Sequence, residues 1–239
     1  MRLTVIGCSP AWPNPGGAHA GFLVEGEGRL LLDCGPGVLA KLRRREAWPR
    51  IDAIAVTHFH LDHFGDLVPW VWGSRHGPGS EVTPPKLYVP AGGRARLAAI
   101  GTQLAHDSMF DETFEIVEFA GDEPFTAAGF RLTARRMQHY GDHAYGFTVE
   151  TGSKRLAYSG DTGPTAALAE LARGADLFLC EATLERAEDD SEPRGHLSPA
   201  EAADAFEASG AGRLVLVHRP ADLEAGAYEL ARDGLVIEV

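Results

Sequence analysis

Residues 57–63 read THFHLDH and directly follow the apolar run IDAIAV at 51–56. That run is short, apolar and contains β-branched residues, which predicts a buried strand. The stretch after it contains His58, His60, Asp62 and His63. Neutral imidazole and carboxylate are ligands for zinc, manganese or iron(II). The stretch therefore predicts a metal site at the end of a strand.

The spacing within this motif suits two adjacent ions. On an extended segment His58 and His60 share a face, so both can reach one metal. Where the chain then turns into a helix, Asp62 and His63 can be directed toward a second metal. A single histidine in this place would more often be a core or helix-cap residue, but the clustered pattern favours ligands.

Further ligand types follow other strand-like runs. His139 follows FRLTARRMQ, Asp161 follows RLAYSG, and His218 follows RLVLV. Strand ends at one edge of a sheet project side chains into a common space, so we expect these residues to join the motif in one site. None of them is a cysteine, which removes the argument for a closed structural zinc site.

The order of predicted elements indicates an α/β (α+β) fold. Strand-like runs and helical stretches alternate along the chain, and the first three runs follow one another as antiparallel strands do. The expected helices cover residues 37–46, 65–75, 92–104, 165–174 and 198–210. Such a series favours two sheets packed face to face with helices outside, a four-layer αββα sandwich. We expect residues 1–239 to form a single domain.

Composition and charge limit the partners. The chain has 239 residues, 44% of them hydrophobic, and a net charge of −12. Nucleic-acid binders usually show a basic footprint, whereas this surface is acidic. The one concentrated basic run, KLRRRE at 41–46, is typical of a solvated helix face. A small anionic substrate remains compatible with the charge, because bound divalent cations would offset it locally.

The sequence also predicts the compartment. It contains no apolar stretch of membrane-spanning length, and its start lacks the build of a signal peptide. Cys8, Cys34 and Cys180 are odd in number and far apart, which favours reduced, buried thiols over a disulfide framework. We therefore expect a cytoplasmic protein with no membrane partner. The oligomeric state stays open, a homodimer included.

Three motifs together resemble the metallo-β-lactamase superfamily over essentially the whole chain: THFHLDH, YSGDT at 158–162, and the histidine after LVLV. Within that superfamily the chain is similar to the ribonuclease Z-type, small phosphodiesterase branch. Asp161 stands where β-lactamases have a bridging cysteine. CEAT at 180–183 is close to the His-Glu-Ala-Thr motif of ribonuclease Z, with Cys180 replacing the histidine. GHLSPAEAA at 195–203 takes the place of that family's His-Ser-Thr segment.

The resemblance implies a metallo-β-lactamase-like hydrolase domain of αββα fold and two divalent metal ions, with zinc expected ahead of manganese or iron. One ion would be bound by His58, His60 and His139. The other would be bound by Asp62, His63 and His218. Asp161 would bridge the two.

The resemblance also implies catalytic roles. Glu181 and His196 match the family's outer pair, which is thought to manage a proton at the leaving group. In chemical terms, Asp62 can hold and deprotonate the nucleophile, and His196 can protonate the departing alkoxide while Glu181 fixes its tautomer. Two plainer interpretations stay open: Glu181 as the partner of a metal-bound imidazole, and His196 as a loop residue.

The substrate is predicted from what the sequence lacks. In ribonuclease Z a long arm that grasps tRNA is commonly inserted between the equivalents of His139 and Asp161, but here residues 140–160 are taken up by a strand–turn–strand. With the acidic charge, this favours a dinuclear phosphodiesterase acting on small diesters such as cyclic nucleotides. One alternative is a ribonuclease Z-type tRNA 3′-processing endonuclease, which an arm or basic strip from a dimer partner would favour. The other is a lactonase or thioesterase, which predicts an apolar pocket without phosphate-binding cations.

Four aromatic residues lie next to these motifs and could stack on a base: Trp12, Trp70, Trp72 and Tyr140. Core packing is the more frequent role of tryptophans in a run such as VPWVW, and we expect it for Trp72.

Overall fold

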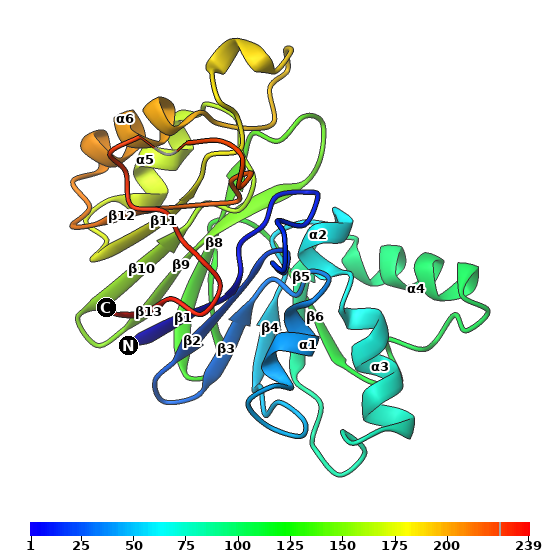
Figure 1. Cartoon of the computed structure of the whole chain (residues 1–239). Helices are drawn as coiled ribbons and strands as arrows, with labels where there is room; N and C mark the ends of the chain where they lie inside the picture. The colour runs from blue at the N-terminus through cyan, green and yellow to red at the C-terminus, as the bar shows by residue number, and fades with distance from the viewer. Residues whose placement is uncertain (225) are drawn as a thin grey trace.

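The computed structural model describes residues 1–224 and 226–239, in which two β-sheets stand face to face (Figure 1). The strands of the first sheet are β1 (Arg2–Gly7), β2 (Gly21–Glu25), β3 (Arg29–Leu32), β4 (Ala53–Ala55), β5 (Lys86–Pro90), β6 (Glu115–Phe119) and β13 (Val236–Glu238). Their order across this seven-stranded sheet is β13-β1-β2-β3-β4-β5-β6. As expected, β1, β2 and β3 pair antiparallel, and the pairs from β3 to β6 are parallel.

The second sheet is built from the later part of the chain. Its strands are β7 (Pro124–Ala127), β8 (Phe130–Met137), β9 (Ala144–Thr151), β10 (Lys154–Tyr158), β11 (Leu177–Glu181) and β12 (Leu214–Val217). They are ordered β12-β11-β10-β9-β8-β7. The short edge strand β7 was not predicted. It begins with a proline, which is tolerated at the first position of an edge strand.

Helices cover the outer face of each sheet. Those on the first sheet are α1 (Val38–Leu42), α2 (Leu61–Phe64), α3 (Leu67–His76) and α4 (Gly93–Gln103). The second sheet carries α5 (Ala166–Ala172) and α6 (Pro199–Ser209), and a 3₁₀ turn, η1 (Ala187–Asp189), lies in the loop before α6. None of the helices in the described ranges is long and apolar enough to cross a bilayer.

The apolar strands are buried on both faces. In β2, Phe22 and Val24 belong to the core between the sheets, whereas Leu23 packs into the cluster under the helices of the first sheet. In β3, Leu30 and Leu32 face the inner core and Leu31 faces the helices. A third cluster lies between the second sheet and α5 and α6. Alternate side chains along each strand thus pack into the core between the sheets and into the core under the helices. This is the packing of the predicted αββα sandwich.

The first helix is shorter than expected. We predicted a helix over residues 37–46, but α1 ends at Leu42 and the three arginines that follow form turns. Lys41 is followed by Arg44 and Arg45 at i+3 and i+4, and like charges at this spacing weaken a helix. Trp48 also draws the chain back, because it is buried against Trp70, with ring centroids 5.8 Å apart. Most of the basic run is therefore an exposed turn.

The topology brings several strand ends to one edge. Strands β10, β11 and β12 are parallel, and β8 runs in the same direction because both β8 and β10 pair antiparallel with β9. Their carboxyl ends therefore meet. The segments that follow them carry the polar residues singled out above.

A candidate dinuclear metal centre

The structure brings all the expected ligands together in two groups. The first group is His58, His60, His139 and Asp161. The second is Asp62, His63, Asp161 and His218. Within each group the potential ligand atoms lie within 4.8 Å of one another. Asp161 belongs to both groups, which is the position of a bridging ligand.

In the second group one nitrogen of each imidazole is hydrogen-bonded to an outer partner, and the other nitrogen points toward the other ligands. His63 Nδ1 donates to Asp33 Oδ2 at 2.8 Å, and His218 Nδ1 lies 2.8 Å from Thr183 Oγ1. The opposite nitrogens face carboxylates: His218 Nε2 is 3.0 Å from Asp62 Oδ2, and His63 Nε2 is 3.3 Å from Asp62 Oδ2. Such outer partners fix the tautomer and the ring orientation of a metal ligand.

The first group follows the same principle. His139 Nδ1 donates to the carbonyl of Gly195 at 2.7 Å, and His60 Nε2 donates to Asp142 Oδ2 at 3.0 Å. His58 Nδ1 lies 3.1 Å from Thr57 Oγ1. The remaining nitrogens of His60 and His139 face each other at 2.9 Å. Two imidazole nitrogens that point toward the same space can both coordinate one cation placed there.

Buried polar atoms without partners support a metal at this place. His58 Nε2, His63 Nε2 and Asp161 Oδ1 are buried and have no hydrogen-bond partner in the part of the chain that the structure describes. Buried polar atoms are nearly always satisfied, so a cluster of unsatisfied ones needs an explanation. Divalent ions would complete all three. The donor set of imidazoles and carboxylates therefore fits such ions.

Electrostatics prepare His58, Asp161 and Asp62 for ligation. His63 differs: burial alone would lower its pKa, but Asp161 and Asp33 outweigh burial and hold that pKa well above its ordinary value, so a metal would displace its proton. Burial, helped by the nearby His63, lowers the pKa of His58 well below its ordinary value, so this imidazole is neutral. Burial alone would raise the pKa of Asp161, but His218 and His63 outweigh it and hold that pKa well below the usual range. The pKa of Asp62 is likewise lowered by His63 and His218 against the effect of burial. Neutral imidazoles and ionised carboxylates are the metal-binding forms.

Asp33 organises the buried end of the site. It follows β3, and its fully buried carboxylate accepts hydrogen bonds from Thr57 N at 2.7 Å, from Tyr158 Oη at 2.8 Å and from His63. Its φ of 58° lies in the left-handed region, which non-glycine residues seldom adopt. Sequence reasoning missed this residue. The available signal was an acidic residue placed directly after an otherwise apolar strand.

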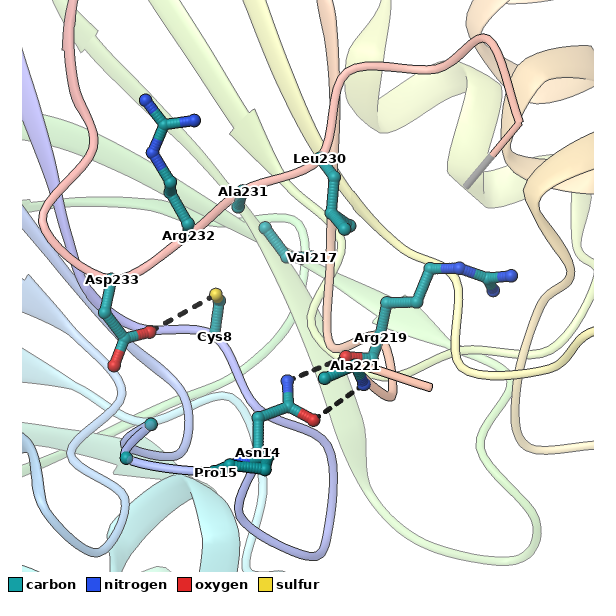
Figure 2. Close-up of a pocket in the computed structure, with 12 residues that line it drawn as sticks. Cys8, Asn14, Pro15, Val217, Arg219, Ala221, Leu230, Ala231, Arg232 and Asp233 are labelled. Atoms are coloured by element: carbon teal, nitrogen blue, oxygen red, sulfur yellow. Dashed lines mark hydrogen bonds between the residues drawn. The ribbon is translucent and has the colours of Figure 1, made fainter. Parts of the chain in front are cut away.

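The backbone around His218 is also held from outside the cluster. The His218 N–H donates to the carbonyl of Cys8 at 3.0 Å, and His218 itself has a left-handed φ of 55°. Figure 2 shows the neighbouring cavity of about 320 Å³, where Asn14 joins the N-terminal loop to the segment after His218. Asn14 Nδ2 donates to the Arg219 carbonyl at 3.0 Å, and its Oδ1 accepts from Ala221 N at 2.8 Å. The N-terminal loop thus fixes the last ligand.

Glu181 and His196 form a hydrogen-bonded pair next to the cluster. His196 Nδ1 donates to Glu181 Oε1 at 2.8 Å, and its ring stacks on that of His218 at 5.7 Å between centroids. The buried Glu181 also accepts from Thr162 N and from both the N–H and hydroxyl of Thr183. Burial disfavours the charged imidazole, but Glu181 overcomes this and raises the pKa of His196 to about 9.

The aromatic residues fall into different places. Trp70 is fully buried against Trp48, so it cannot stack on a base. Trp72 is not in the core as expected: it is 40% exposed on α3 and stacks on His76. The pattern VPWVW faces the interior at the first tryptophan and solvent at the second. Tyr140 is exposed and lies beside His139 and His196, and Trp12 is exposed on the N-terminal loop.

The loop between Glu181 and His196 is strongly acidic. It carries Glu185, Glu188, Asp189, Asp190 and Glu192, and with η1 it projects at the top of Figure 1. Asp190 Oδ2 accepts from the Gly195 N–H at 2.9 Å, which joins the loop to the residue before His196. The basic residues in and next to the loop are paired, Arg186 with Asp189 at 3.0 Å and Arg194 with Glu201 at 2.6 Å. The loop therefore presents negative charge near the site.

Comparison with known proteins gives three informative likenesses. The family model for the beta-lactamase superfamily domain matches residues 28–219. An uncharacterised protein of Mycobacterium tuberculosis H37Rv is 33% identical over 225 residues, covering 92% of this chain and 81% of that protein. The probable metallo-hydrolase YhfI of Bacillus subtilis is 28% identical over 233 residues, covering 92% of this chain and 87% of the relative.

Solved structures agree. The crystal structure of YhfI superposes with a TM-score of 0.84 at 26% identity and covers 99% of both chains. The short form of human tRNase Z superposes with a TM-score of 0.79 at 26% identity, covering 100% of this chain and 99% of that chain.

Proposed function

This chain belongs to the metallo-β-lactamase superfamily of metallo-hydrolases, and from that premise we propose that it is a dinuclear phosphodiesterase acting on small phosphodiesters such as cyclic nucleotides. The observation that carries the proposal is the Glu181–His196 pair beside a complete ligand cluster. A metal centre alone would serve many hydrolyses. A protonatable imidazole next to it suits a reaction whose leaving group is a poor one, such as an alkoxide.

We assign the ligands as two sets. His58, His60 and His139 would hold one ion, Asp62, His63 and His218 the other, and Asp161 would bridge, with zinc the expected metal. Bound divalent ions would make water a nucleophile at neutral pH and neutralise charge on the phosphodiester. Asp62 would orient the attacking water and accept its proton. His196, held by Glu181 through Nδ1, would donate a proton to the departing oxygen.

The substrate is proposed to be small because of what surrounds the site. The segment between His139 and Asp161 consists of β9, β10 and the turns that flank them. It therefore leaves no room for a tRNA-binding arm, as the sequence predicted. The acidic loop and the net charge of −12 would repel a long polyanion. A monoanionic diester would meet little of this repulsion, because ions held by the ligand cluster would neutralise most of its charge.

Two alternatives predict different chemistry. The likeness to human tRNase Z favours tRNA 3′ processing. The acidic loop between Glu181 and His196 opposes it, because it would repel the polyanionic tRNA. A lactonase or thioesterase predicts an apolar pocket without phosphate-binding cations, whereas Arg96 is exposed on α4 near Asp142, the partner of His60. A cation in this place suits an anionic substrate.

The test compares kcat/KM of the metal-loaded protein for 3′,5′-cyclic AMP and for a 3′-extended tRNA in the same buffer, with a lactone and a thioester alongside. We expect turnover of the cyclic nucleotide and little or no cleavage of the tRNA. Site-specific trimming of the tRNA with negligible cyclic-nucleotide hydrolysis would overturn the proposal. Rapid cleavage of the lactone or thioester alone would move the protein to that class.

A further inference from the structure

Tyr140 occupies a special place at the mouth of the candidate site. It follows the ligand His139, and its ring lies 5.0 Å from the His139 ring and 5.7 Å from the His196 ring, between centroids. Large aromatic side chains are usually buried, but 41% of Tyr140 is exposed. An exposed aromatic ring thus lies beside both a first-group ligand and the proposed proton donor.

The surrounding backbone holds this ring in place. Tyr140 has a φ of 45°, in the left-handed region that costs a non-glycine residue energy and that recurs at functional sites. Gly195 makes room for the ring, because a Cβ at that position would lie 2.3 Å from it. The Gly195 carbonyl in turn accepts from His139 Nδ1 at 2.7 Å. One side of the ring is therefore covered by Gly195, and the exposed part lies on the remaining sides.

The position of the ring relates it to the reacting bond. His196 is the proposed donor to the leaving oxygen, so a ring edge-on to His196 lies near the leaving side of a bound diester. In a nucleoside diester the group attached on that side carries a planar base. A flat aromatic face held by backbone geometry, without a flexible stem, is what base stacking requires.

We propose that Tyr140 is a substrate-specificity residue that stacks on a nucleobase, so that the site selects nucleotides over diesters that lack a base. This inference rests on the proposed function, since it takes the substrate to be a phosphate ester at the metal centre. It narrows the substrate class to nucleoside phosphates. Glycerol-type and sugar phosphodiesters would bind through their phosphate alone.

The experiment measures binding, so that it does not depend on turnover. Isothermal titration of the metal-loaded protein with AMP and with ribose 5-phosphate compares two ligands that share a sugar phosphate and differ in the base. Base stacking on an aromatic side chain corresponds to a preference of about 10- to 100-fold for AMP. Tyr140→Leu should reduce this preference to about threefold or less, and Tyr140→Phe should keep it.

Two controls separate stacking from a structural role. Trp72→Leu removes another exposed aromatic residue, one that lies on α3, and should leave the preference for AMP unchanged. Metal content and the affinity for ribose 5-phosphate should be the same in wild type and Tyr140→Leu, because both report the site without the base. A Tyr140→Leu variant that loses affinity for both ligands equally would show a structural role and overturn the proposal.

Other outcomes are equally decisive. A wild-type protein that binds AMP and ribose 5-phosphate alike, or a Tyr140→Leu variant that retains the preference, would overturn the stacking role. An AMP preference that depends on Tyr140 in a protein without phosphodiesterase activity would uphold this inference and refute the proposed reaction. The two failures are therefore distinguishable.

Discussion

Two histidines of the motif HFHLDH, His60 and His63, each pair with a carboxylate, and the two pairs differ in burial. His63 donates to Asp33 at 2.8 Å, and both side chains are fully buried. His60 donates to Asp142 at 3.0 Å, but these side chains are 41% and 36% exposed. The chemistry and length of the two hydrogen bonds are similar. We infer that the inner pair contributes to folding, whereas the outer pair mainly tunes ligation.

The inner pair is also part of a larger network. Asp33 joins the end of β3 to Thr57 after β4 and to Tyr158 in β10, so one carboxylate connects the two sheets. In a buried network every member depends on its partners, because water cannot replace a lost hydrogen bond. Asp142, in contrast, lies where water can replace it. This difference sets the size of the effects expected below.

The largest effect is expected for Asp33→Ala. It would leave Thr57, Tyr158 and His63 without their buried acceptor, and breaking a buried ionic network costs about 3–5 kcal/mol. We expect a loss of this size in the free energy of unfolding, measured by urea denaturation of the metal-free protein. Asp142→Ala is the matched control and should lose less than about 1 kcal/mol. Equal losses in both variants would contradict the inferred difference between the pairs.

His196→Ala tests the Glu181–His196 pair, whose exposure lies between these extremes. His196 is largely buried and Glu181 fully so, but neither is in the two proposed ligand sets. We expect the rate of cyclic-nucleotide hydrolysis to fall by about 10²–10⁴-fold with metal content unchanged. The loss should shrink for bis-(p-nitrophenyl) phosphate, whose leaving group needs no proton.

The contrasting variant is Asp62→Ala, which removes a proposed ligand and the proposed base and should lose both activity and metal. If His196→Ala also lost its metals, His196 would be a ligand and not the proton donor.

Asp142→Asn should act on metal affinity and little on stability. The change weakens the acceptor of His60, and loss of such an outer partner typically costs 10- to 100-fold in metal affinity. We expect the weaker of the two metal-binding steps, measured by competition with a chromophoric chelator, to become weaker still. Glu115→Gln, a remote exposed carboxylate paired with Lys86, is the control and should have no effect. An unchanged affinity in Asp142→Asn would make the outer pair irrelevant to ligation.

The sequence could predict the histidines of the inner and outer pairs but not the carboxylates that hold them. His58, His60, His139 and His218 were recognised because each follows a strand-like run whose end the fold brings to one edge. Their partners come from segments far away in the chain, and pairing across the two sheets leaves no local pattern. Asp142 sits in an ordinary polar turn and gave no signal.

The same limit applied to packing. The helix and strand order follows from apolar periodicity, so the αββα layers were predictable. The end of α1 was not, because it depends on how Trp48 packs after the turn, and the exposure of Trp72 on α3 was not expected either. Local pattern therefore predicted which residues meet, and tertiary contacts decided how each of them is held.

The smallest effect is expected one step further from the ligands, at Arg96. Its Nη2 lies 3.9 Å from Asp142 Oδ1, and 57% of its side chain is exposed. An exposed ion pair is worth about 0–1 kcal/mol, so Arg96→Gln should change metal affinity by no more than about fivefold. Raising the ionic strength should remove this difference, because salt screens exposed charges. A double-mutant cycle with Asp142→Asn isolates the coupling, and a coupling near zero is expected in high salt. A coupling that persisted there would mean that the outer pair is shielded from solvent after all, and the contrast with Asp33 would then lie in network size and not in burial.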